Sequence, residues 1–314
     1  MRRVRIGTRA SPLARWQAET VATALVRAGG PSAELIFIRT SGDRLQRKPI
    51  SGAGGKRLFV KEIEEALVEG RVDVAVHSAK DLPAVRVAGL RVQAVLPRED
   101  ARDAVVARRT RKDPETDPDA LFASGRAPRV GTGSVRRTAQ LRYAYPHLDV
   151  APIRGNVGTR LDQLDTGAFD LLVLATAGLV RLDLDARIAV RLPFDLCVPA
   201  PGQGIVCAEY RGGDEEIRGL LSMIADRDAG AALETERALV TALAADCQVP
   251  LGAVTTVAGD KLRLRSVVAA PDGATLVRHE ADGSLAAPAA LGAEVAAGLL
   301  AAGAGPLLEA ARAR

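Results

Sequence analysis

Short apolar runs alternate with amphipathic stretches over the first two-thirds of the chain. Runs rich in Val, Ile and Leu are typical of buried strands, and apolar residues that recur every three or four positions are typical of helices. The runs predict strands over residues 3–8, 34–39, 72–76, 129–132, 149–153 and 170–175. The amphipathic stretches predict helices over residues 11–28, 58–70, 134–144 and 156–166. This alternation indicates an α/β fold with a largely parallel sheet.

The pattern changes after residue 214. A long helical stretch over residues 228–245 leads into the apolar run 249–258, and two further β-rich runs flank Pro271-Asp272-Gly273. Strands on either side of such a turn form a hairpin, so we expect a small three-stranded antiparallel sheet that is packed by helices. An Ala-rich helix closes the chain. Because a charged, Pro-rich segment over 108–128 also separates two α/β blocks, the chain is expected to form three domains.

Composition places the chain among ordinary globular proteins. Its 314 residues correspond to about two domains of ~150 residues, or to three small ones. Hydrophobic residues make up 47% and charged residues 26%, whereas the 3% of aromatic residues argues against a stacking surface for single-stranded nucleic acid. The net charge of +5 is too small to indicate a nucleic-acid-binding protein by itself.

The sequence shows no pattern of export or membrane insertion. Charged residues interrupt the N-terminal stretch, where a secretion signal needs an apolar run. Pro288, Glu294 and Pro306 break the apolar tail over 285–309, so it does not predict a membrane span. Three cysteines without CxxC spacing indicate neither a disulfide framework nor a zinc site. We therefore expect a cytoplasmic protein with no metal and no membrane partner.

Arginines concentrate in one region. Residues 129–160 contain six arginines and a single acid, Asp149. Two predicted strand-to-helix turns lie in this region: GTGSVRR over 131–137, and a second turn at 154–156 that opens a helix carrying Arg160. Free N–H groups at a helix start and guanidiniums both bind oxyanions. The region predicts a site for a ligand with several carboxylates or phosphates, and the alternative is a solvated arginine-rich face.

A second candidate site is HSAKDLP, residues 77–83, directly after the predicted strand 72–76. Polar side chains at the carboxyl end of a parallel strand lie where open α/β sheets bind ligands. The carboxylate of Asp81, beside Lys80, could stabilise a developing cation or relay protons. The alternative is that Asp81 begins a turn ahead of Pro83 and that His77 is a satisfied buried imidazole.

The three cysteines differ in their surroundings. Cys197 and Cys207 stand in apolar runs and are interpreted as core residues. Cys247 stands between Asp246 and Gln248 in a polar loop setting, where a thiol would be reachable. Cys247 is therefore a candidate nucleophile or attachment point.

Taken in order, these segments resemble the porphobilinogen deaminase (hydroxymethylbilane synthase) family, over nearly the whole chain. The matching segments are RIGTRASPLARWQAE (5–19), GGKRLFVKEIE (54–64), HSAKDLP (77–83), GTGSVRR (131–137), IRGNVGTRL (153–161), LLVLATAGLVRL (171–182), PAPGQG (199–204) and CQVPLGA (247–253). The resemblance implies two periplasmic-binding-protein-like α/β domains plus a small α+β C-terminal domain with a three-stranded antiparallel sheet. The implied boundaries are residues 1–98 with 200–220, residues 99–199, and residues 221–314.

The resemblance also implies a transferase that condenses four porphobilinogen molecules, each with loss of ammonia, and releases hydroxymethylbilane by hydrolysis. The implied cofactor is a dipyrromethane joined by a thioether to Cys247, and the implied catalytic residue is Asp81, which stabilises cationic azafulvene and pyrrolenine species. The implied binding residues for the ligand carboxylates are Arg9, Ser11, Lys56, Ser78, Lys80, Thr132, Ser134, Arg136, Arg137, Arg154, Asn156, Arg160, Arg181 and Gln203. Porphobilinogen is the expected partner, and the protein is expected to be a monomer that binds no nucleic acid.

Two alternatives remain open from the sequence. A non-catalytic anion- or solute-binding protein of related two-domain fold would also bind anions through arginines, but it predicts no attached cofactor. A nucleic-acid-binding protein would contact phosphates with a steep salt dependence. The sequence departs from the family at Ala245-Asp246, where two glycines are common.

Overall fold

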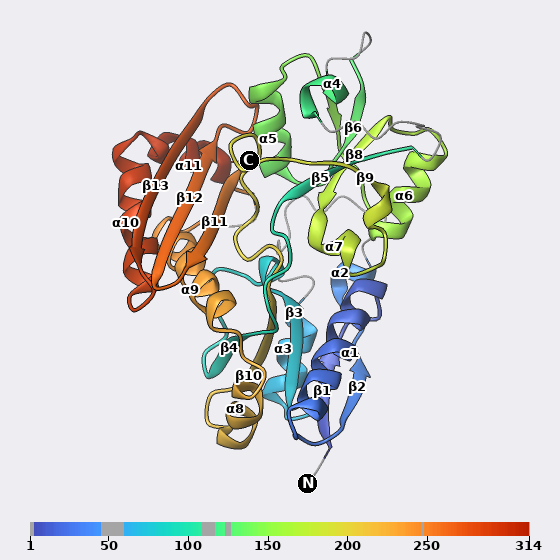
Figure 1. Ribbon diagram of the computed structural model, residues 1–314, viewed down its shortest axis with the longest axis vertical. Coiled ribbons are helices and arrows are strands. Elements are labelled where there is room, and N and C mark those ends of the chain that lie inside the picture. Colours follow the sequence, from blue (N-terminus) through green and yellow to red (C-terminus); the bar gives the residue numbers. More distant parts are fainter. Residues whose placement is uncertain (1–2, 45–59, 109–116, 123–126, 246–247, 314) are drawn as a thin grey trace.

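Three β-sheets organise the part of the chain that the structure describes. The computed structural model describes residues 3–44, 60–108, 117–122, 127–245 and 248–313. Two five-stranded sheets lie one above the other in Figure 1, and a three-stranded sheet lies beside the upper one. The predicted α/β class and the predicted three-stranded antiparallel sheet are confirmed.

The first sheet has helices on both faces. Its strands, in spatial order, are β2 (Ala33–Phe37), β1 (Val4–Thr8), β3 (Val74–Ser78), β10 (Val206–Arg211) and β4 (Leu90–Val95). Helices α1 (Pro12–Arg27) and α8 (Glu215–Ser222) cover one face, and α3 (Lys61–Val68) covers the other. Side chains alternate along a strand, so Val74 and Val76 of β3 pack with α1 whereas Ala75 packs with α3. The short helix α2 (Ser41–Arg44) follows β2, and the 3-10 turn η2 (Ala79–Asp81) follows β3.

The second sheet repeats this arrangement. Its strands, in spatial order, are β7 (Asp149–Ala151), β6 (Arg129–Gly131), β8 (Leu171–Ala175), β5 (Asp103–Ala107) and β9 (Ile188–Arg191). The accompanying helices are α4 (Pro118–Phe122), α5 (Val135–Ala144), α6 (Val157–Asp165), α7 (Thr176–Val180) and the turn η3 (Asp185–Arg187). Val173 of β8 packs with α5 on one face, and Leu172 packs with α6 on the other.

One strand in each of these sheets runs against the other four. The antiparallel strands are β10 in the first sheet and β5 in the second. Each is the first strand that the chain enters after crossing from the other sheet, through residues 96–102 or 192–205. A strand that begins where the two sheets meet must run away from that boundary. The remaining strands therefore end at the boundary, and the turns after β3, β6 and β7 face the opposite sheet.

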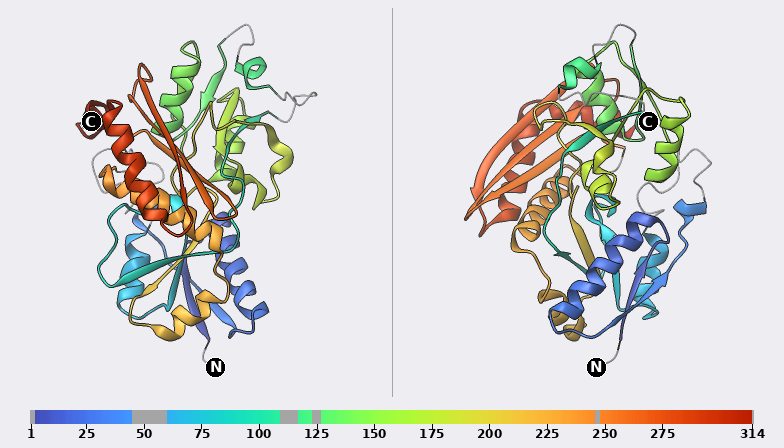
Figure 2. Two further views of the ribbon diagram at one scale, coloured as in Figure 1. Left: turned by 60° about the vertical axis from the view of Figure 1, so that its left-hand side comes forward. Right: turned by 45° about the vertical axis from the view of Figure 1, so that its right-hand side comes forward.

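The third sheet is a meander covered by helices on one face. It consists of β11 (Leu251–Ala258), β12 (Lys261–Ala269) and β13 (Leu276–Ser284), with α9 (Arg227–Ala242), α10 (Pro288–Ala301) and α11 (Ala304–Arg312) packed against its apolar side. Figure 2 shows α10 lying along these strands. Arg263 pairs with Asp282 on the solvent side at 2.6 Å, which opposes charges across β12 and β13. The predicted hairpin around Pro271-Asp272-Gly273 is confirmed.

Several boundaries differ from the sequence prediction. Strand β3 extends to Ser78, two residues beyond the predicted strand that ends at residue 76, so His77 belongs to the sheet. The predicted closing helix is two helices, because the chain turns at Gly303, whose φ is +95°. The division into three domains stays a prediction.

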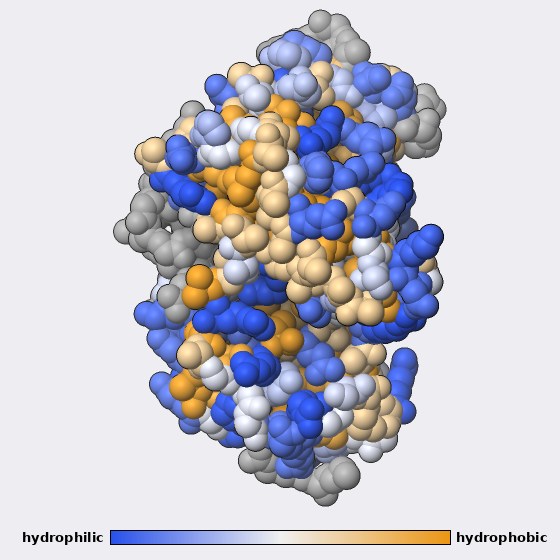
Figure 3. Space-filling view, turned by 90° about the vertical axis from the view of Figure 1, so that its left-hand side faces the viewer, coloured by the Kyte–Doolittle hydropathy of each residue, from blue (hydrophilic) through white to orange (hydrophobic). Residues whose placement is uncertain are grey.

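No single helix in the described ranges is long and apolar enough to cross a membrane. Helices α10 and α11 meet the length and composition criteria only as a pair, bent by 93°. Figure 3 shows the side of the molecule that lies on the left in Figure 1. Hydrophilic and hydrophobic side chains are interspersed over this face.

Candidate active site

Asp81 and Lys80 lie where the first sheet meets the second. Both belong to η2, the single turn that follows β3, and the N–H of Ala79 donates to the carbonyl oxygen of Ile205 at 3.0 Å. Lys80 is half-buried, and its Nζ donates to Oε1 of Gln203 at 3.2 Å. Burial lowers the pKa of Lys80 to about 8, and the neighbouring Asp81 carboxylate partly opposes this shift.

A buried carboxylate, Asp103, organises the positive side chains of the second sheet. Nη1 of Arg136 lies 2.8 Å from Oδ2 of Asp103, and Nη2 of Arg137 lies 2.7 Å from Oδ1. Gln203 donates to the same Oδ1 at 2.8 Å, which links this cluster to Lys80. Burial alone would raise the pKa of Asp103, but Arg136 and Arg137 hold that pKa far below its usual range. Asp103 lies outside the arginine-rich window of residues 129–160, so the sequence pattern did not indicate its role.

The turn before α5 forms as the sequence predicts. Ser134 is the N-cap, and its Oγ accepts a hydrogen bond from the N–H of Arg137 at 3.4 Å. The N–H of Ser134 donates to Oγ1 of Thr132 at 3.3 Å. The side chains of Arg136 and Arg137 are 4% and 7% exposed, so the alternative of a solvated face is wrong for these two arginines.

The turn before α6 places Arg160 within electrostatic reach of Asp81. Asn156 is the N-cap and accepts a hydrogen bond from the N–H of Thr159 at 2.9 Å. Arg160 is half-buried, and its Nε donates to the carbonyl oxygen of Gly155 at 2.8 Å. Burial, then Arg137 and Arg154, lower the pKa of Arg160 to about 10, and Asp81 opposes them. The fold thus brings Asp81 of the first sheet within electrostatic reach of Arg160 of the second.

Four other predicted residues contact protein groups in this structure. Arg9 forms an ion pair with Asp43, and its Nε lies 3.1 Å from Oδ1 of that residue. Ser11 is the N-cap of α1, and Ser78 accepts a hydrogen bond from Gln17 at 2.7 Å. Nη2 of Arg181 donates to the carbonyl oxygen of Gly204 at 2.7 Å. These contacts set where the side chains lie before any ligand binds.

The loop PAPGQG brings Gln203 between the two sheets. Gly202 has a φ of +77°, and a Cβ at that position would lie 2.9 Å from the backbone nitrogen of Lys80. Only glycine fits this backbone conformation and this close approach without strain. Gln203 is therefore held against Lys80 on one side and Asp103 on the other.

Glu236, a second buried acid that the sequence did not indicate, joins both crossing segments to the third sheet. It is fully buried on α9. Its carboxylate accepts hydrogen bonds from Arg98 at 2.7 Å, from the N–H of Gly202 at 2.6 Å and from the N–H of Thr255 at 2.7 Å. A run of charged residues within a helix carried no signal of this role, since its partners come from distant segments.

Comparison with known proteins decides the family. Residues 4–219 match the family model described as "Porphobilinogen deaminase, dipyromethane cofactor binding domain", and residues 231–301 match "Porphobilinogen deaminase, C-terminal domain". The chain belongs to the porphobilinogen deaminase family. The porphobilinogen deaminase of Acidithiobacillus ferrooxidans is 48% identical over 307 residues, which cover 98% of this chain and 97% of that protein. The porphobilinogen deaminase of Bordetella parapertussis is 44% identical over 308 residues, 98% of this chain and 95% of that protein.

Among solved structures, the periplasmic aliphatic sulphonate binding protein SsuA from Escherichia coli is similar to this chain. The similarity covers 76% of this chain and 69% of that chain, with a TM-score of 0.40 and 13% sequence identity.

The described residues fit the cofactor of the porphobilinogen deaminase family, whose pyrrole rings carry carboxylate side chains. Within the described ranges, Lys80, Arg154 and Arg160 have no carboxylate within ion-pair distance. The Nε atoms of Arg136 and Arg137 are buried and also lack a hydrogen-bond partner there. Cations without acidic partners, and N–H donors without acceptors, suit a ligand that brings its own carboxylates.

Two of the predicted site residues, Lys56 and Cys247, lie outside the described residues. Cys197 and Cys207 are fully buried, which confirms their interpretation as core residues. Burial and the adjacent Asp103 raise the pKa of Cys197 to about 12, and burial also raises the pKa of Cys207. In the described part of the chain, no group of His, Cys, Asp or Glu has the arrangement to hold a metal ion.

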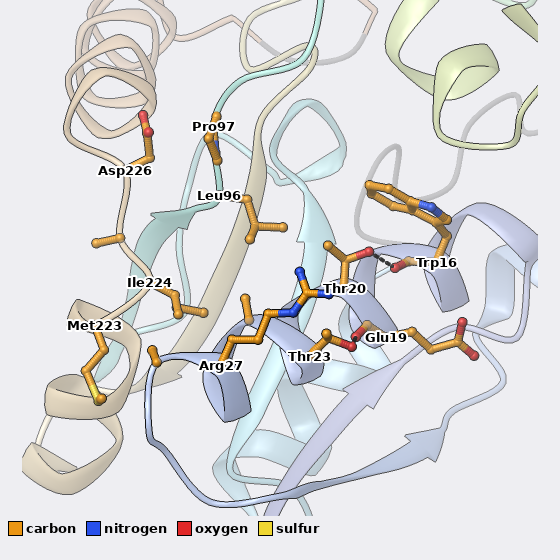
Figure 4. A pocket seen from close by; sticks show the side chains of 13 residues that line it. Trp16, Glu19, Thr20, Thr23, Arg27, Leu96, Pro97, Met223, Ile224 and Asp226 are labelled. Atoms are coloured by element: carbon orange, nitrogen blue, oxygen red, sulfur yellow. Dashed lines mark hydrogen bonds between the residues drawn. The ribbon is translucent and has the colours of Figure 1, made fainter.

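A separate groove of about 730 Å³ lies along α1 (Figure 4). Its lining residues come from α1, from residues 96–97 and from residues 223–226. None of the predicted site residues lines it. Trp16 lines the groove, and the centre of its ring lies 5.4 Å from the guanidinium carbon of Arg181.

Proposed function

We propose that this chain is a transferase that condenses four porphobilinogen molecules, one at a time and each with loss of ammonia, and releases hydroxymethylbilane by hydrolysis. The observation that carries the proposal is the placement of one carboxylate, Asp81, among cations that lack acidic partners, in a chain of this family. Such a site suits a reaction in which a cationic centre forms on a substrate that bears carboxylates.

The proposed cofactor is a dipyrromethane attached to Cys247. When bound, it would supply the nucleophilic pyrrole carbon to which the first unit is joined. Its carboxylates would be held by Arg136, Arg137, Arg154 and Arg160, with hydroxyl and amide donors at Thr132, Ser134 and Asn156. Arg9, Ser11, Lys56, Ser78, Arg181 and Gln203 complete the proposed lining. Guanidiniums suit this task because they stay charged at any working pH and bind carboxylates through two nitrogens.

Asp81 is the proposed catalytic residue. When the protonated aminomethyl group of porphobilinogen leaves as ammonia, the pyrrole nitrogen supplies the electron pair and positive charge remains on the ring. A carboxylate close to that ring stabilises the charge. It then accepts the proton that is displaced when the carbon–carbon bond forms. Lys80, beside it, binds a substrate carboxylate and so places the ring against Asp81.

The remaining features of the proposal concern the whole protein. We propose the three domains given above, with the first two meeting at the site and residues 221–314 carrying Cys247. We also propose that the protein is a cytoplasmic monomer whose partner is porphobilinogen, without a nucleic-acid or membrane partner. The crossing segments 96–102 and 192–205 would permit the relative motion that a lengthening product requires.

Intact mass of the purified chain tests the attachment. Protein from cells that make porphobilinogen should be heavier than the polypeptide by one dipyrromethane, and Cys247→Ala protein should have the bare mass. A bare mass for the unaltered chain would favour the alternative of a solute-binding protein.

The role of Asp81 is tested separately. Asp81→Asn keeps the size and polarity of the side chain, so the variant should fold and load the cofactor but lose at least about 100-fold in kcat. Wild-type turnover in this variant would overturn the catalytic assignment, whatever the mass measurement gives.

A further inference from the structure

Arg237, on α9, holds the backbone that follows Asp81. Its Nη2 donates to the carbonyl oxygen of Pro83 at 3.1 Å and to that of Ala84 at 3.2 Å. Both carbonyls belong to the segment between η2 and β4, where residues 82–89 form no helix or strand. The guanidinium therefore supplies hydrogen bonds that regular secondary structure does not supply there.

Asp81 has few contacts of its own. Its side chain is half-buried and forms no hydrogen bond or ion pair with the part of the chain that the structure describes. It ends a three-residue 3-10 turn, and a turn of that length has little stability of its own. The position of its carboxylate is consequently set by the backbone on either side. Upstream, Ala79 is bonded to Ile205 at 3.0 Å, and downstream the bonds come from Arg237.

The surroundings of Arg237 favour a role as a hydrogen-bond donor rather than as a partner of a carboxylate. The side chain is half-buried, and no carboxylate of the described residues lies within ion-pair distance of it. Burial and Arg86 lower its pKa, and Cys207 and Glu209 on β10 oppose this shift. Because a desolvated guanidinium needs acceptors, the two carbonyls after Asp81 are what keep it in place.

Helix α9 is itself fixed next to Arg237. The adjacent Glu236 accepts hydrogen bonds from Arg98 in one crossing segment, from Gly202 in the other, and from Thr255 of β11. The helix is thus tied to the boundary of all three sheets one residue before Arg237. A side chain on a helix that is fixed in this way can hold the segment that it binds in one position.

We propose that Arg237 is a positioning residue, which fixes Asp81 by binding the backbone of residues 83 and 84. The inference rests on the proposed catalytic role of Asp81. Helix α9 ends at Ala242, shortly before Cys247 in the sequence. Arg237 therefore also joins the segment after Asp81 to the helix that precedes the proposed attachment residue.

The test compares Arg237→Met and Arg237→Lys with a matched control, Arg108→Met. Met keeps most of the apolar stem and removes the donors. Arg108 also donates from Nη2 to two backbone carbonyls, of Gly167 and Phe169, but at the far end of β5. For each protein, intact mass, kcat, KM for porphobilinogen and amide hydrogen exchange of residues 79–86 are measured.

We expect Arg237→Met to load the cofactor fully and to keep KM within about threefold, while kcat falls about 10- to 100-fold, as it does when a reacting group is displaced by about 1 Å. Amide hydrogen exchange in residues 79–86 should accelerate at least about tenfold, and the exchange rates in β3 should not change. Arg237→Lys should recover part of kcat, and Arg108→Met should leave kcat and this exchange unchanged.

Three outcomes overturn the proposal. One is a wild-type kcat in Arg237→Met, and another is an equal loss of kcat in Arg108→Met. The third is loss of cofactor loading in both Arg237 variants, which would place the residue in attachment instead. If Arg237 acts through Asp81, adding Arg237→Met to Asp81→Asn should lower the residual kcat by less than about twofold. An active Asp81→Asn protein would refute the proposed catalytic role of Asp81, whereas an inactive one beside a fully active Arg237→Met would refute this inference alone.

Discussion

Arg137 and Asp103 form a buried ion pair, in which Nη2 of the arginine lies 2.7 Å from Oδ1 of the carboxylate. The arginine belongs to α5 and the acid begins β5, 34 residues earlier in the chain. Asp103 accepts from Arg136 and Gln203 as well. One carboxylate therefore fixes two arginines of the proposed anion site and, through Gln203, the lysine beside Asp81.

Asp103→Asn should strongly destabilise the protein, because it leaves two buried guanidiniums without a counter-charge. Removal of one partner from a buried ion pair costs about 3–5 kcal/mol of unfolding free energy, which urea denaturation would measure. Asp282→Asn, which breaks an exposed pair with Arg263, is the control and should leave the midpoint unchanged. Equal midpoints for the two variants would contradict this account of Asp103.

The pH profile of kcat/KM should reveal Lys80. Because burial lowers the pKa of Lys80 to about 8, its ammonium loses a proton as the pH rises through that value, and binding of a substrate carboxylate weakens. We expect kcat/KM of the wild type to fall above about pH 8. In Lys80→Met the value should be lower throughout and should lack this fall. A fall of the same size in the variant would assign it to another group.

Lys80 should also affect stability, with a defined sign. Its pKa is lowered to about 8 in the folded protein from 10.5, so between these values the unfolded chain binds more protons than the folded one. The contribution of Lys80 to the unfolding free energy should therefore rise with pH from about 8 to 10.5. The wild type and Lys80→Met, unfolded in urea across this range, should differ in slope, and parallel slopes would contradict the shift.

Gly202→Ala should disturb the contact between the PAPGQG loop and Lys80. The φ of +77° is unfavourable for alanine, and the added Cβ would lie 2.9 Å from the nitrogen of Lys80. We expect a loss of about 1–3 kcal/mol in unfolding free energy, together with a raised KM. Gly213→Ala is the control, since a Cβ there would meet nothing within 4 Å. A Gly202 variant as stable as this control would show that the loop adjusts to the added Cβ without loss of unfolding free energy.

Alkylation should separate the three cysteines. Cys197 and Cys207 are fully buried with raised pKa values, so iodoacetamide should not modify them in the folded protein. Cys207→Ala should load the cofactor as the wild type does, and Cys247→Ala should not. Peptide mapping by mass spectrometry checks both points, and modification of Cys197 in native protein would contradict its buried position.

Much of the fold could be read from the hydrophobic pattern. Strands β1, β2, β6, β7 and β8 and helices α1, α5 and α6 form within two residues of the predicted positions, because their apolar periodicity is local. The pattern did not predict β4, β5, β9 and β10. Two of these, β5 and β10, run against their sheets, and their pairing depends on where the chain crosses between sheets rather than on neighbouring residues.

The sequence by itself determined the turns at which the site forms. Ser134 and Asn156 cap their helices through side chains that lie within three residues of the N–H groups they accept from, so local chemistry is sufficient. Only the tertiary structure decided the charge of the site. A count of six arginines and one acid in residues 129–160 does not include Asp103, which lies outside that window and neutralises two of them. Ion pairs act through space, so the balance of cations around Asp81 was fixed when the two sheets came together.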